Sequence, residues 1–543
     1  MQIREHDFFE AKAKRQYTSY QSKESISTRG SIYFKESSGN LLWAATIKDG
    51  FQAALNPMLI NDDSIVCDMV SNIIELDKSL CLVRAGKKDD PFEVIAHRLD
   101  VEDAEKVNAL NLRGLGAYPE QWRLYPGESL ASQVLGFVGY KGDELEGRYG
   151  VERYYEDILR GKKENLTGGS SFAALFVELG KDFLSSGVYN GHDVVLTIEP
   201  RVQSFLENIL GTLLEKWKAE SAGAVILDPQ TGAIVAMAGK PDFNPNKYGT
   251  TEDISYFKNP IVSSIFEMGS VFKPLTMAAA IDVGSVSPST TYFDSGFVAL
   301  NNRTIENYDG KGRGFVDMQE VLNQSLNTGA VFVMQKLGKE KFYDYLKSFG
   351  LDKKTGIDLP DEVEGRLSNL LSGRDIEYAT ASFGQGVAIS PLEFTMAISS
   401  LANEGKIMRP YIVEKIIIEG GVNNITSPKT EREVLKPETA KEVTRMLVRV
   451  VDEALLGGTV KSDHYSIAAK TGTAQMVKEG GGYYEDQYLH TFFGYAPAFD
   501  ARFLIFFFLE KPQGVRYASH TLTESFMKTM NFLLNYYEVP PDR

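Results

Sequence analysis

The chain has 543 residues, which is too long for one ordinary hydrophobic core and predicts two or three domains. Its 43% hydrophobic and 24% charged residues are typical of a folded soluble protein. The formal net charge of −15 argues against a nucleic-acid partner, because phosphate binding requires a basic surface.

The cysteine and histidine content points away from a metalloprotein. Cys67, Cys81 and six scattered histidines show no metal-ligand spacing, so neither a metal nor another cofactor is expected. Two cysteines fit the cytosol and a bacterial exterior equally well. No run of about 18 uncharged apolar residues occurs, and residues 1–16 predict a charged amphipathic helix, not a signal peptide.

The first third of the chain is mixed in character. Residues 29–47 predict two short strands around the Ser-Ser-Gly-Asn turn at 37–40. Residues 100–112 predict a helix, and 125–164 run from a turn through small residues to an aromatic, charged helix. A glycine- and serine-containing stretch at 166–172 is then followed by a predicted strand and an amphipathic helix, and this change predicts a domain boundary at 187–188.

The remainder has strands at both ends and helices between. A strand and an amphipathic helix after Pro200 occupy 190–220, a hairpin 221–239, and helical segments 270–455. Three strands at 466–477, 490–499 and 501–511 precede a last helix at 520–537. This order predicts an α/β or α+β sheet that pairs early strands with late ones and carries helices packed on it.

A serine and a lysine stand three residues apart in "FEMGSVFKPLTMAAA" (266–280). At that spacing in a first helical turn, Lys273 lies on the side of Ser270 and can accept its proton. Gly269 permits a close backbone approach, and Pro274 is tolerated only in a first turn. Ser270 is therefore expected at a helix N-terminus, with local strain at Lys273 because a residue before proline disfavours helical geometry.

Two further motifs become informative together with the first. Ser325 and Asn327 in "NQSLNTGAV" (323–331) are expected at a loop tip between two helices, where helix capping alone would explain them. Lys470 is an isolated charge in the strand "AAKTGTAQ" (468–475), and Gly472 marks a close backbone approach. Burial and the charge of Lys470 predict a lowered pKa for Lys273, which would make it a base.

The ordered trio Ser-x-x-Lys, Ser-x-Asn and Lys-Thr-Gly is typical of penicillin-binding proteins and class A β-lactamases. Over nearly its whole length the chain resembles a class B penicillin-binding protein, a monofunctional peptidoglycan transpeptidase. Met268 departs from the proline that this family prefers before Gly-Ser. The segments "STRGSI" (27–32), "RLYPGESLASQVLGFVG" (123–139), "GVERYYEDILRGK" (150–162) and "FGQGVAISPLE" (383–393) also resemble the family.

The resemblance implies a fold and an arrangement of domains. Residues 1–187 would form an elongated mixed α/β pedestal of the dimerisation type, and residues 188–543 a penicillin-binding transpeptidase domain. Residues 1–16 resemble the segment that follows an N-terminal membrane anchor. The resemblance therefore implies attachment to the cytoplasmic membrane, with the bulk of the chain on its outer face.

The resemblance also implies site residues. Ser270 would attack the penultimate D-Ala carbonyl of a stem peptide, with Lys273 as base, and Ser325 and Lys470 would relay the proton to the leaving amine. The N–H groups of Ser270 and Thr473 would form the oxyanion hole. Substrate would be bound by Asn327, Thr471, Gly472 and Thr473, and β-lactams would acylate Ser270.

Several alternatives remain open at this stage. A β-lactamase would usually have half this length and no use for the first 190 residues. A D,D-carboxypeptidase would use water in place of the acceptor amine, and a division scaffold or β-lactam sensor would keep the fold without turnover. Septal synthesis is favoured over elongation by Asn327 and by "GGYYEDQYLHTFFGYAPA" (481–498). The implied partners are a glycosyltransferase and membrane proteins of the division or elongation machinery.

Overall fold

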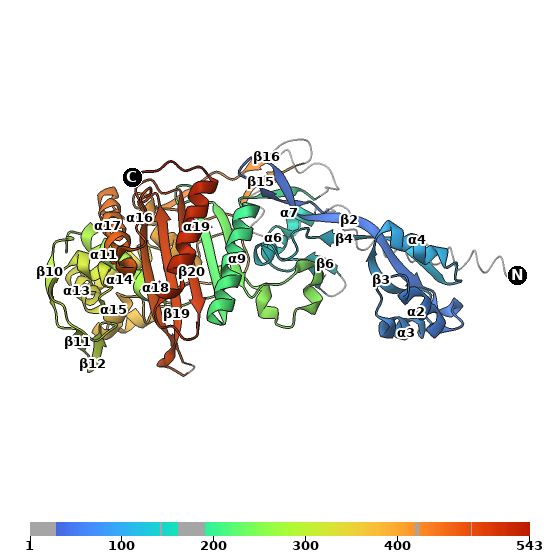
Figure 1. The fold of residues 1–543 in the computed structure, drawn as a ribbon, viewed down its shortest axis with the longest axis horizontal. Helices are drawn as coiled ribbons and strands as arrows, with labels where there is room; N and C mark the ends of the chain where they lie inside the picture. The colour runs from blue at the N-terminus through green and yellow to red at the C-terminus, as the bar shows by residue number, and fades with distance from the viewer. Residues whose placement is uncertain (1–28, 142–143, 161–190, 419–422, 479) are drawn as a thin grey trace.

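The computed structural model describes residues 29–141, 144–160, 191–418, 423–478 and 480–543. It is an elongated molecule with a small lobe near the N-terminus, a middle region and a large lobe that carries the C-terminus (Figure 1). The predicted amphipathic helix at 1–16 and the predicted boundary at 187–188 lie outside the described residues.

A seven-stranded sheet in the middle region joins distant parts of the chain, in the order β16-β15-β7-β1-β2-β3, with β4 paired to β2. The predicted strands around the turn at 37–40 are confirmed, although the second is longer than expected. The strands are β1 (Ile32–Lys35), β2 (Leu41–Leu55), β3 (Glu93–Leu99), β4 (Leu115–Leu124), β7 (Asp193–Leu196), β15 (Val413–Ile417) and β16 (Asn423–Ile425).

The small lobe is built at the far ends of β2, β3 and β4. Its own apolar core lies between these strands and three helices, and a disulfide joins Cys67 to Cys81, which the sequence did not predict. The predicted helix at 100–112 is confirmed as α4. The helices are α2 (Asp63–Ser71), α3 (Lys78–Ala85) and α4 (Val101–Ala109), with η2 (Pro57–Leu59) before them.

The segment 125–160 folds into short elements beside the middle sheet. The expected aromatic helix is present as two pieces, because the chain leaves helical geometry at Tyr155. Its elements are α5 (Ser132–Leu135), β5 (Val138–Lys141), β6 (Glu144–Gly147), α6 (Gly150–Tyr154) and α7 (Glu156–Arg160).

A five-stranded sheet, in the order β18-β19-β20-β8-β9, forms the centre of the large lobe. It confirms the predicted pairing of early with late strands, since β20 lies antiparallel to β8 with Phe506 opposite Val225. The predicted hairpin at 221–239 is β8 and β9. The strands are β8 (Ser221–Leu227), β9 (Ile234–Lys240), β18 (Ala468–Val477), β19 (Tyr483–Ala496) and β20 (Phe503–Glu510).

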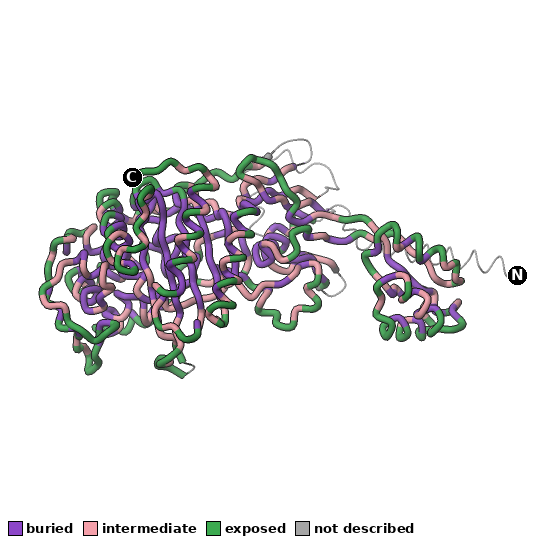
Figure 2. Tube along the Cα trace, viewed as in Figure 1, coloured by how far each residue is buried: buried purple, intermediate pink, exposed green. Residues whose placement is uncertain are grey.

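Both faces of this sheet are covered, which explains the continuous apolar run of β20. Phe506 and Phe508 belong to one core, and Phe507 and Leu509 to the core on the opposite face, where α9 and α19 pack. Figure 2 shows the buried strands between exposed outer surfaces. The covering helices on this second face are α9 (Pro200–Trp217), α18 (Ala518–Thr521) and α19 (Thr523–Tyr536).

The other face of the sheet carries the helical region that contains the first two motifs. Its main helices are α11 (Lys273–Asp282), α12 (Met318–Asn323), α13 (Asn327–Leu337), α14 (Lys339–Ser348), α15 (Asp375–Ala381), α16 (Pro391–Ala402) and α17 (Pro437–Arg449). Short two-stranded sheets accompany them: β10 (Thr291–Asp294) with β13 (Gly314–Asp317), the hairpin of β11 (Phe297–Leu300) and β12 (Arg303–Glu306), and β14 (Lys406–Met408) with β17 (Thr430–Glu433). The single-turn helices are η4 (Pro245–Thr250), η5 (Ile254–Phe257), α10 (Pro260–Ser263), η6 (Gly269–Phe272), η7 (Ser368–Ser372), η8 (Val450–Ala454) and η9 (Leu455–Gly458).

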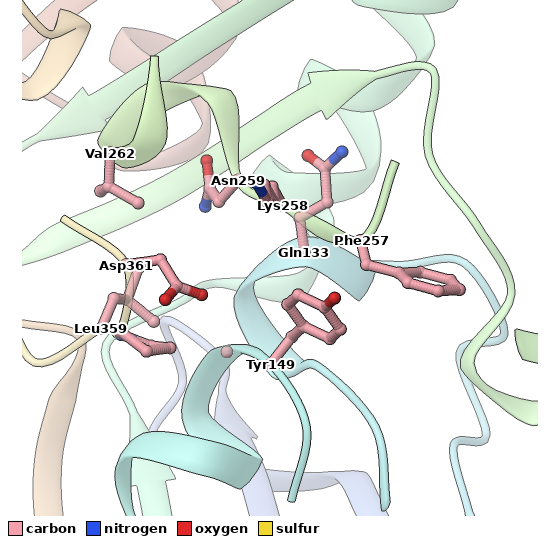
Figure 3. A pocket seen from close by; sticks show the side chains of 10 residues that line it. Gln133, Tyr149, Phe257, Lys258, Asn259, Val262, Leu359 and Asp361 are labelled. Carbon is pink, nitrogen blue, oxygen red and sulfur yellow. The ribbon is translucent and has the colours of Figure 1, made fainter. Parts of the chain in front are cut away.

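The middle region is tightly packed against the large lobe. Arg153 forms an ion pair with Asp361 at 2.8 Å, and the Tyr155 hydroxyl donates to Asp358 at 2.8 Å. A cavity of about 10 Å³ remains at this junction, between Tyr149, Phe257 and Leu359 (Figure 3). That volume admits about one water molecule, so the cavity is too small for a substrate.

Candidate active site

The loop that carries Ser270 is held in place by tight backbone contacts. Gly269 has φ +67°, a conformation that favours glycine, and a Cβ there would make a tight contact of 3.2 Å with the backbone carbon of Thr473 in β18. Ser270 is partly exposed in η6, while Val271 and Phe272 are buried. The expected position at the start of a helix is therefore met by a 3-10 turn that leads into α11.

Lys273 begins α11 in helical geometry, with φ −55° and ψ −37°, although Pro274 follows it. This confirms the helical geometry expected of Lys273 before proline, while the predicted strain stays a prediction.

The segment 383–390 supports the same loop from the other side. The Gly269 N–H donates to the Gly384 carbonyl at 3.1 Å, and the Phe266 N–H donates to the Ile389 carbonyl at 2.9 Å. A Cβ on Gly384, which has φ +78°, would lie 2.4 Å from the Gly269 oxygen. The sequence of this segment resembles the family but does not by itself indicate that it supports the Ser270 loop.

Lys273 is buried and points at the second motif. Its Nζ donates to the Ser325 carbonyl at 2.5 Å and to Asn327 Oδ1 at 2.8 Å, and it lies 3.3 Å from Ser325 Oγ. Burial, and secondly the charge of Lys470, hold the pKa of Lys273 well below its usual value of 10.5. The predicted depression of this pKa and both of its predicted causes are confirmed.

Ser325 lies at the predicted loop tip between α12 and α13. Its φ of +54° is a left-handed conformation that costs energy for a residue with a side chain, and such strain clusters at functional sites. The Asn327 side chain is fixed at both ends, because its amide nitrogen donates to the Glu306 carbonyl at 2.8 Å while its oxygen accepts from Lys273.

A buried polar network behind this loop was not foreseen. The Thr328 hydroxyl lies 2.8 Å from Asp294 and 3.1 Å from Asn307, and the Asn307 amide donates to both Asp294 oxygens. These three side chains are buried and connect α13 to the segment 291–317, which contains four short strands. No local sequence pattern marks them, because the network forms only between segments that are distant in sequence.

Lys470 reaches Ser325 from the opposite side. Its Nζ donates to Ser325 Oγ at 3.0 Å and to the Thr471 carbonyl at 3.0 Å, and burial lowers its pKa to about 7. Among the described residues neither Lys273 nor Lys470 has a carboxylate within 4.0 Å. The Ser325 hydroxyl thus lies between two buried amino groups that no acidic side chain of the described ranges neutralises.

The rest of the third motif is shaped by the approach of the Ser270 loop. A Cβ on Gly472 would lie 2.3 Å from Thr491 Oγ1 and 2.9 Å from the Met268 carbonyl, which confirms the predicted close approach. Thr491 itself donates to that carbonyl at 2.9 Å. Thr473 Oγ1 accepts from the Ala518 N–H at 3.1 Å. Because β18 is an edge strand of its sheet, one side of its backbone is unpaired within the sheet.

The three motifs therefore converge on one site. Ser325 contacts both lysines, and Gly269 packs against Thr473 beside Ser270. Within the described ranges no group of three or more histidine, cysteine or acidic residues could hold a metal ion. No helix in those ranges is long and apolar enough to cross a membrane.

Comparison with known proteins agrees with this geometry. The chain matches the penicillin-binding protein transpeptidase domain over residues 222–531 and the penicillin-binding protein dimerisation domain over residues 24–167. Stage V sporulation protein D of Bacillus subtilis is 33% identical over 465 residues, which are 83% of this chain and 71% of that protein. Peptidoglycan D,D-transpeptidase FtsI of Buchnera aphidicola is 25% identical over 484 residues, 87% of this chain and 80% of that protein.

A solved structure shares the fold as well. Penicillin-binding protein 3 of Mycobacterium tuberculosis, crystallised in complex with aztreonam, has a TM-score of 0.67 and 29% identity, covering 78% of this chain and 92% of that one. The expected fold, a transpeptidase sheet with packed helices preceded by a dimerisation domain, is thereby confirmed. The chain belongs to the class B penicillin-binding proteins, in which a dimerisation domain precedes a transpeptidase domain.

Proposed function

We propose that the chain is a peptidoglycan D,D-transpeptidase that crosslinks stem peptides through an acyl-enzyme on Ser270. The observation that carries this proposal is the Ser325 hydroxyl held between Lys273 and Lys470, together with a partly exposed Ser270 three residues before Lys273. A serine hydroxyl is a weak nucleophile unless a neighbouring base takes its proton. A lysine with a lowered pKa supplies that base at neutral pH.

In the acylation step, Ser270 Oγ bonds to the carbonyl carbon of the penultimate D-Ala and passes its proton to Lys273. The backbone N–H groups of Ser270 and Thr473 stabilise the negative charge on the carbonyl oxygen. The C–N bond to the terminal D-Ala then breaks, and its nitrogen receives a proton through Ser325. Lys470 donates a hydrogen bond to Ser325 Oγ, which leaves the Ser325 hydrogen free to be given.

In the second step an amine from a neighbouring stem peptide attacks the ester carbonyl. It loses a proton to the same basic groups and releases Ser270, so that one amide bond is formed for the one broken. Water in place of the amine would make the chain a D,D-carboxypeptidase, and this remains the alternative outcome of an activity assay.

Substrate binding is assigned to the edge strand and the second motif. The donor peptide would lie along the unpaired side of β18, where Thr471, Gly472 and Thr473 present backbone groups and two hydroxyls to the terminal carboxylate. Asn327 would hold the peptide amide from the opposite side. A β-lactam would occupy the same place and leave Ser270 acylated; aztreonam is bound in the similar Mycobacterium tuberculosis protein.

The cellular setting follows from this chemistry. Peptidoglycan is assembled outside the cytoplasmic membrane, so we place the chain on its outer face, and the Cys67–Cys81 disulfide fits an oxidising compartment. We assign it to septal synthesis, with a glycosyltransferase and membrane proteins of the division machinery as partners. A role in elongation is the alternative. We also retain residues 1–187 as the pedestal and 188–543 as the catalytic domain.

The experiment that tests the function is acylation by a fluorescent penicillin. We expect a covalent adduct on wild type, located at Ser270 by mass spectrometry, no adduct on Ser270→Ala, and acylation at least about 100-fold slower on Lys273→Ala. Circular dichroism checks that the variants fold. A crosslinked product from purified stem-peptide substrate separates transpeptidation from hydrolysis, and a folded wild type without an adduct would contradict the assignment.

A further inference from the structure

Two tyrosines touch each other across the two sides of the proposed site. The rings of Tyr308 and Tyr517 lie edge to face, with centroids 5.8 Å apart and an interplanar angle of 82°. Tyr308 follows β12 in the helical region, and Tyr517 precedes α18 on the side of the five-stranded sheet. Tyr308 is 46% exposed, so this pair is a surface contact and not part of a core.

Each ring is attached through a short stretch of backbone to a residue that is proposed to bind substrate. On one side, Glu306, two residues before Tyr308, accepts a hydrogen bond from Asn327. On the other side, the N–H of Ala518, which follows Tyr517, donates to Thr473. The ring contact therefore joins the segment that holds Asn327 to the segment that holds Thr473.

Arginine side chains flank both rings. The Arg313 guanidinium lies 5.8 Å from the centre of the Tyr308 ring, and the Arg516 guanidinium lies 5.5 Å from that of Tyr517. Arg313 is fixed by two hydrogen bonds to Asp309, at 2.8 and 2.9 Å, and by a third to Gln324. Tyr308 is thus presented from an anchored loop, whereas Arg516 beside Tyr517 is exposed.

Two contacts join the two sides of the site, one buried and one near the surface. At the inner position, the buried Lys470 contacts Ser325 through groups that the reaction uses. At the outer position, the tyrosine pair consists of two apolar ring surfaces with no role in the proposed chemistry. A peptide held by both Asn327 and Thr473 would bridge the same two segments that the outer contact joins.

We propose that Tyr308 and Tyr517 form a gate that controls entry of the donor stem peptide. This inference rests on the proposed function of the site. While the rings touch, the gate is closed; when they separate, the donor or a β-lactam reaches Ser270. The gate therefore limits the encounter with Ser270 and leaves the chemical step unchanged.

The first test separates entry from chemistry. For Tyr308→Ala and Tyr517→Ala we expect the second-order rate constant for acylation by a fluorescent penicillin to rise about 3- to 10-fold, since the contact to be broken is a single weak aromatic pair. The first-order rate constant at saturating penicillin should stay within twofold of wild type. Tyr308→Phe keeps the ring and should restore the slow entry of wild type.

An exposed aromatic pair outside the site provides a matched control. Phe293 and Phe315 also lie edge to face, with centroids 5.3 Å apart, and Phe315 is 80% exposed. Phe315→Ala should leave both rate constants unchanged. A structural effect of removing Tyr308 would lower the two rate constants together, and that result would overturn the gate.

The second test holds the gate shut. Both natural cysteines form the Cys67–Cys81 disulfide, so Tyr308→Cys combined with Tyr517→Cys introduces the only two free thiols. Dibromobimane, which becomes fluorescent when both of its arms have reacted with thiols, should link them and abolish acylation in proportion to the linked fraction. Each single-cysteine variant treated in the same way should remain active.

The outcomes distinguish the two proposals. If linked protein is acylated at the rate of the unlinked double variant, the gate is wrong while the acyl-enzyme assignment stands. If wild type forms no adduct at Ser270, the proposed function itself fails.

Discussion

At the scale of single residues, the site contains two buried lysines, a residue type that is rarely buried in folded proteins. Lys273 and Lys470 are almost fully buried, without a carboxylate partner among the described residues. Burial lowers the pKa of an amino group, so that it is unprotonated at neutral pH and can accept a proton as a base requires. The same burial costs folding free energy. The site therefore gains reactivity from the same burial that lowers the stability of the folded chain.

The stability cost of Lys470 can be measured through its pH dependence. Because the pKa of Lys470 falls from 10.5 to about 7 on folding, the unfolded chain binds an extra proton between these values, so stability rises with pH across that window. At about 1.4 kcal/mol for each pKa unit, and allowing for two lost hydrogen bonds, we expect Lys470→Met to be more stable than wild type by about 3 kcal/mol at pH 7.

Thermal unfolding midpoints at pH 7 and pH 9.5 check this expectation. The advantage of Lys470→Met should shrink at the higher pH, and exposed Lys461→Met should show neither effect. An equal advantage at both pH values would mean that the titration of Lys470 is not the cause.

At the scale of elements, the site depends on how closely η6 lies against β18. The Met268 carbonyl fits over Gly472, and Gly269 fits against Thr473, so two glycines on facing elements allow the backbones to meet. The loop at 383–390 then holds η6 from behind through Gly384. Backbone contacts of η6 with β18 and with the loop at 383–390 thus position Ser270, and its own side chain is left partly exposed.

Gly472→Ala tests this packing. The new Cβ would meet the Met268 carbonyl and the Thr491 hydroxyl, so η6 must move away from β18. A displacement of about 1 Å at a reacting group can cost about 100-fold in rate, and we expect a loss of that order in acylation by penicillin. Gly249→Ala, which meets nothing within 4 Å, is the matched control and should acylate normally. Normal acylation of folded Gly472→Ala would show that the close approach is not needed.

At the scale of the whole molecule, the core of the small lobe and the ionic network of the middle region are separate from the three motifs of the site. The small lobe has its own core and disulfide, and the middle region contains a buried ionic network in which Glu152 binds both Arg29 and Arg123. Burial opposes the charge on Glu152, but Arg123 and Arg29 outweigh it and hold the pKa of Glu152 below its usual range. None of these residues contacts the three motifs, so we expect their loss to affect stability and not acylation.

Glu152→Ala should be strongly destabilising because it leaves the buried Arg123 guanidinium without its carboxylate and Arg29 with Glu156 alone. Breaking such a buried pair costs about 3–5 kcal/mol. Amide hydrogen exchange in β4 and α6 should report the loss, while the rate of acylation stays normal in the folded fraction. Glu102→Ala, which removes an exposed partner of Lys106, is the control and should leave stability nearly unchanged.

Reduction of the Cys67–Cys81 disulfide should loosen the small lobe alone. A loop of this length is worth about 3 kcal/mol in the unfolded-chain model. Limited proteolysis should then cut between residues 57 and 109 sooner, with acylation unchanged. A parallel loss of acylation would indicate that the small lobe and the site are coupled.

The sequence by itself predicted the outline of the large lobe and the proposed catalytic residues. Ser270, Lys273, Ser325 and Lys470 were predicted from three short motifs, because their residue types and local spacing suit acyl transfer to a serine. The hairpin at 221–239 and the late strands were predicted because apolar runs and turn residues are local signals. The lowered pKa of Lys273 was predicted from burial and from the charge of Lys470, and both causes act in the structure.

Only the tertiary structure decided what depends on contacts between distant segments. The Thr328–Asp294–Asn307 network, the support of Gly269 by Gly384 and the Tyr308–Tyr517 contact each join stretches that no local pattern relates. The same holds for the disulfide and for the middle sheet, in which β7 pairs with both β1 and β15. The type of each side chain is given by the sequence, whereas the contacts between distant segments form only when the chain folds.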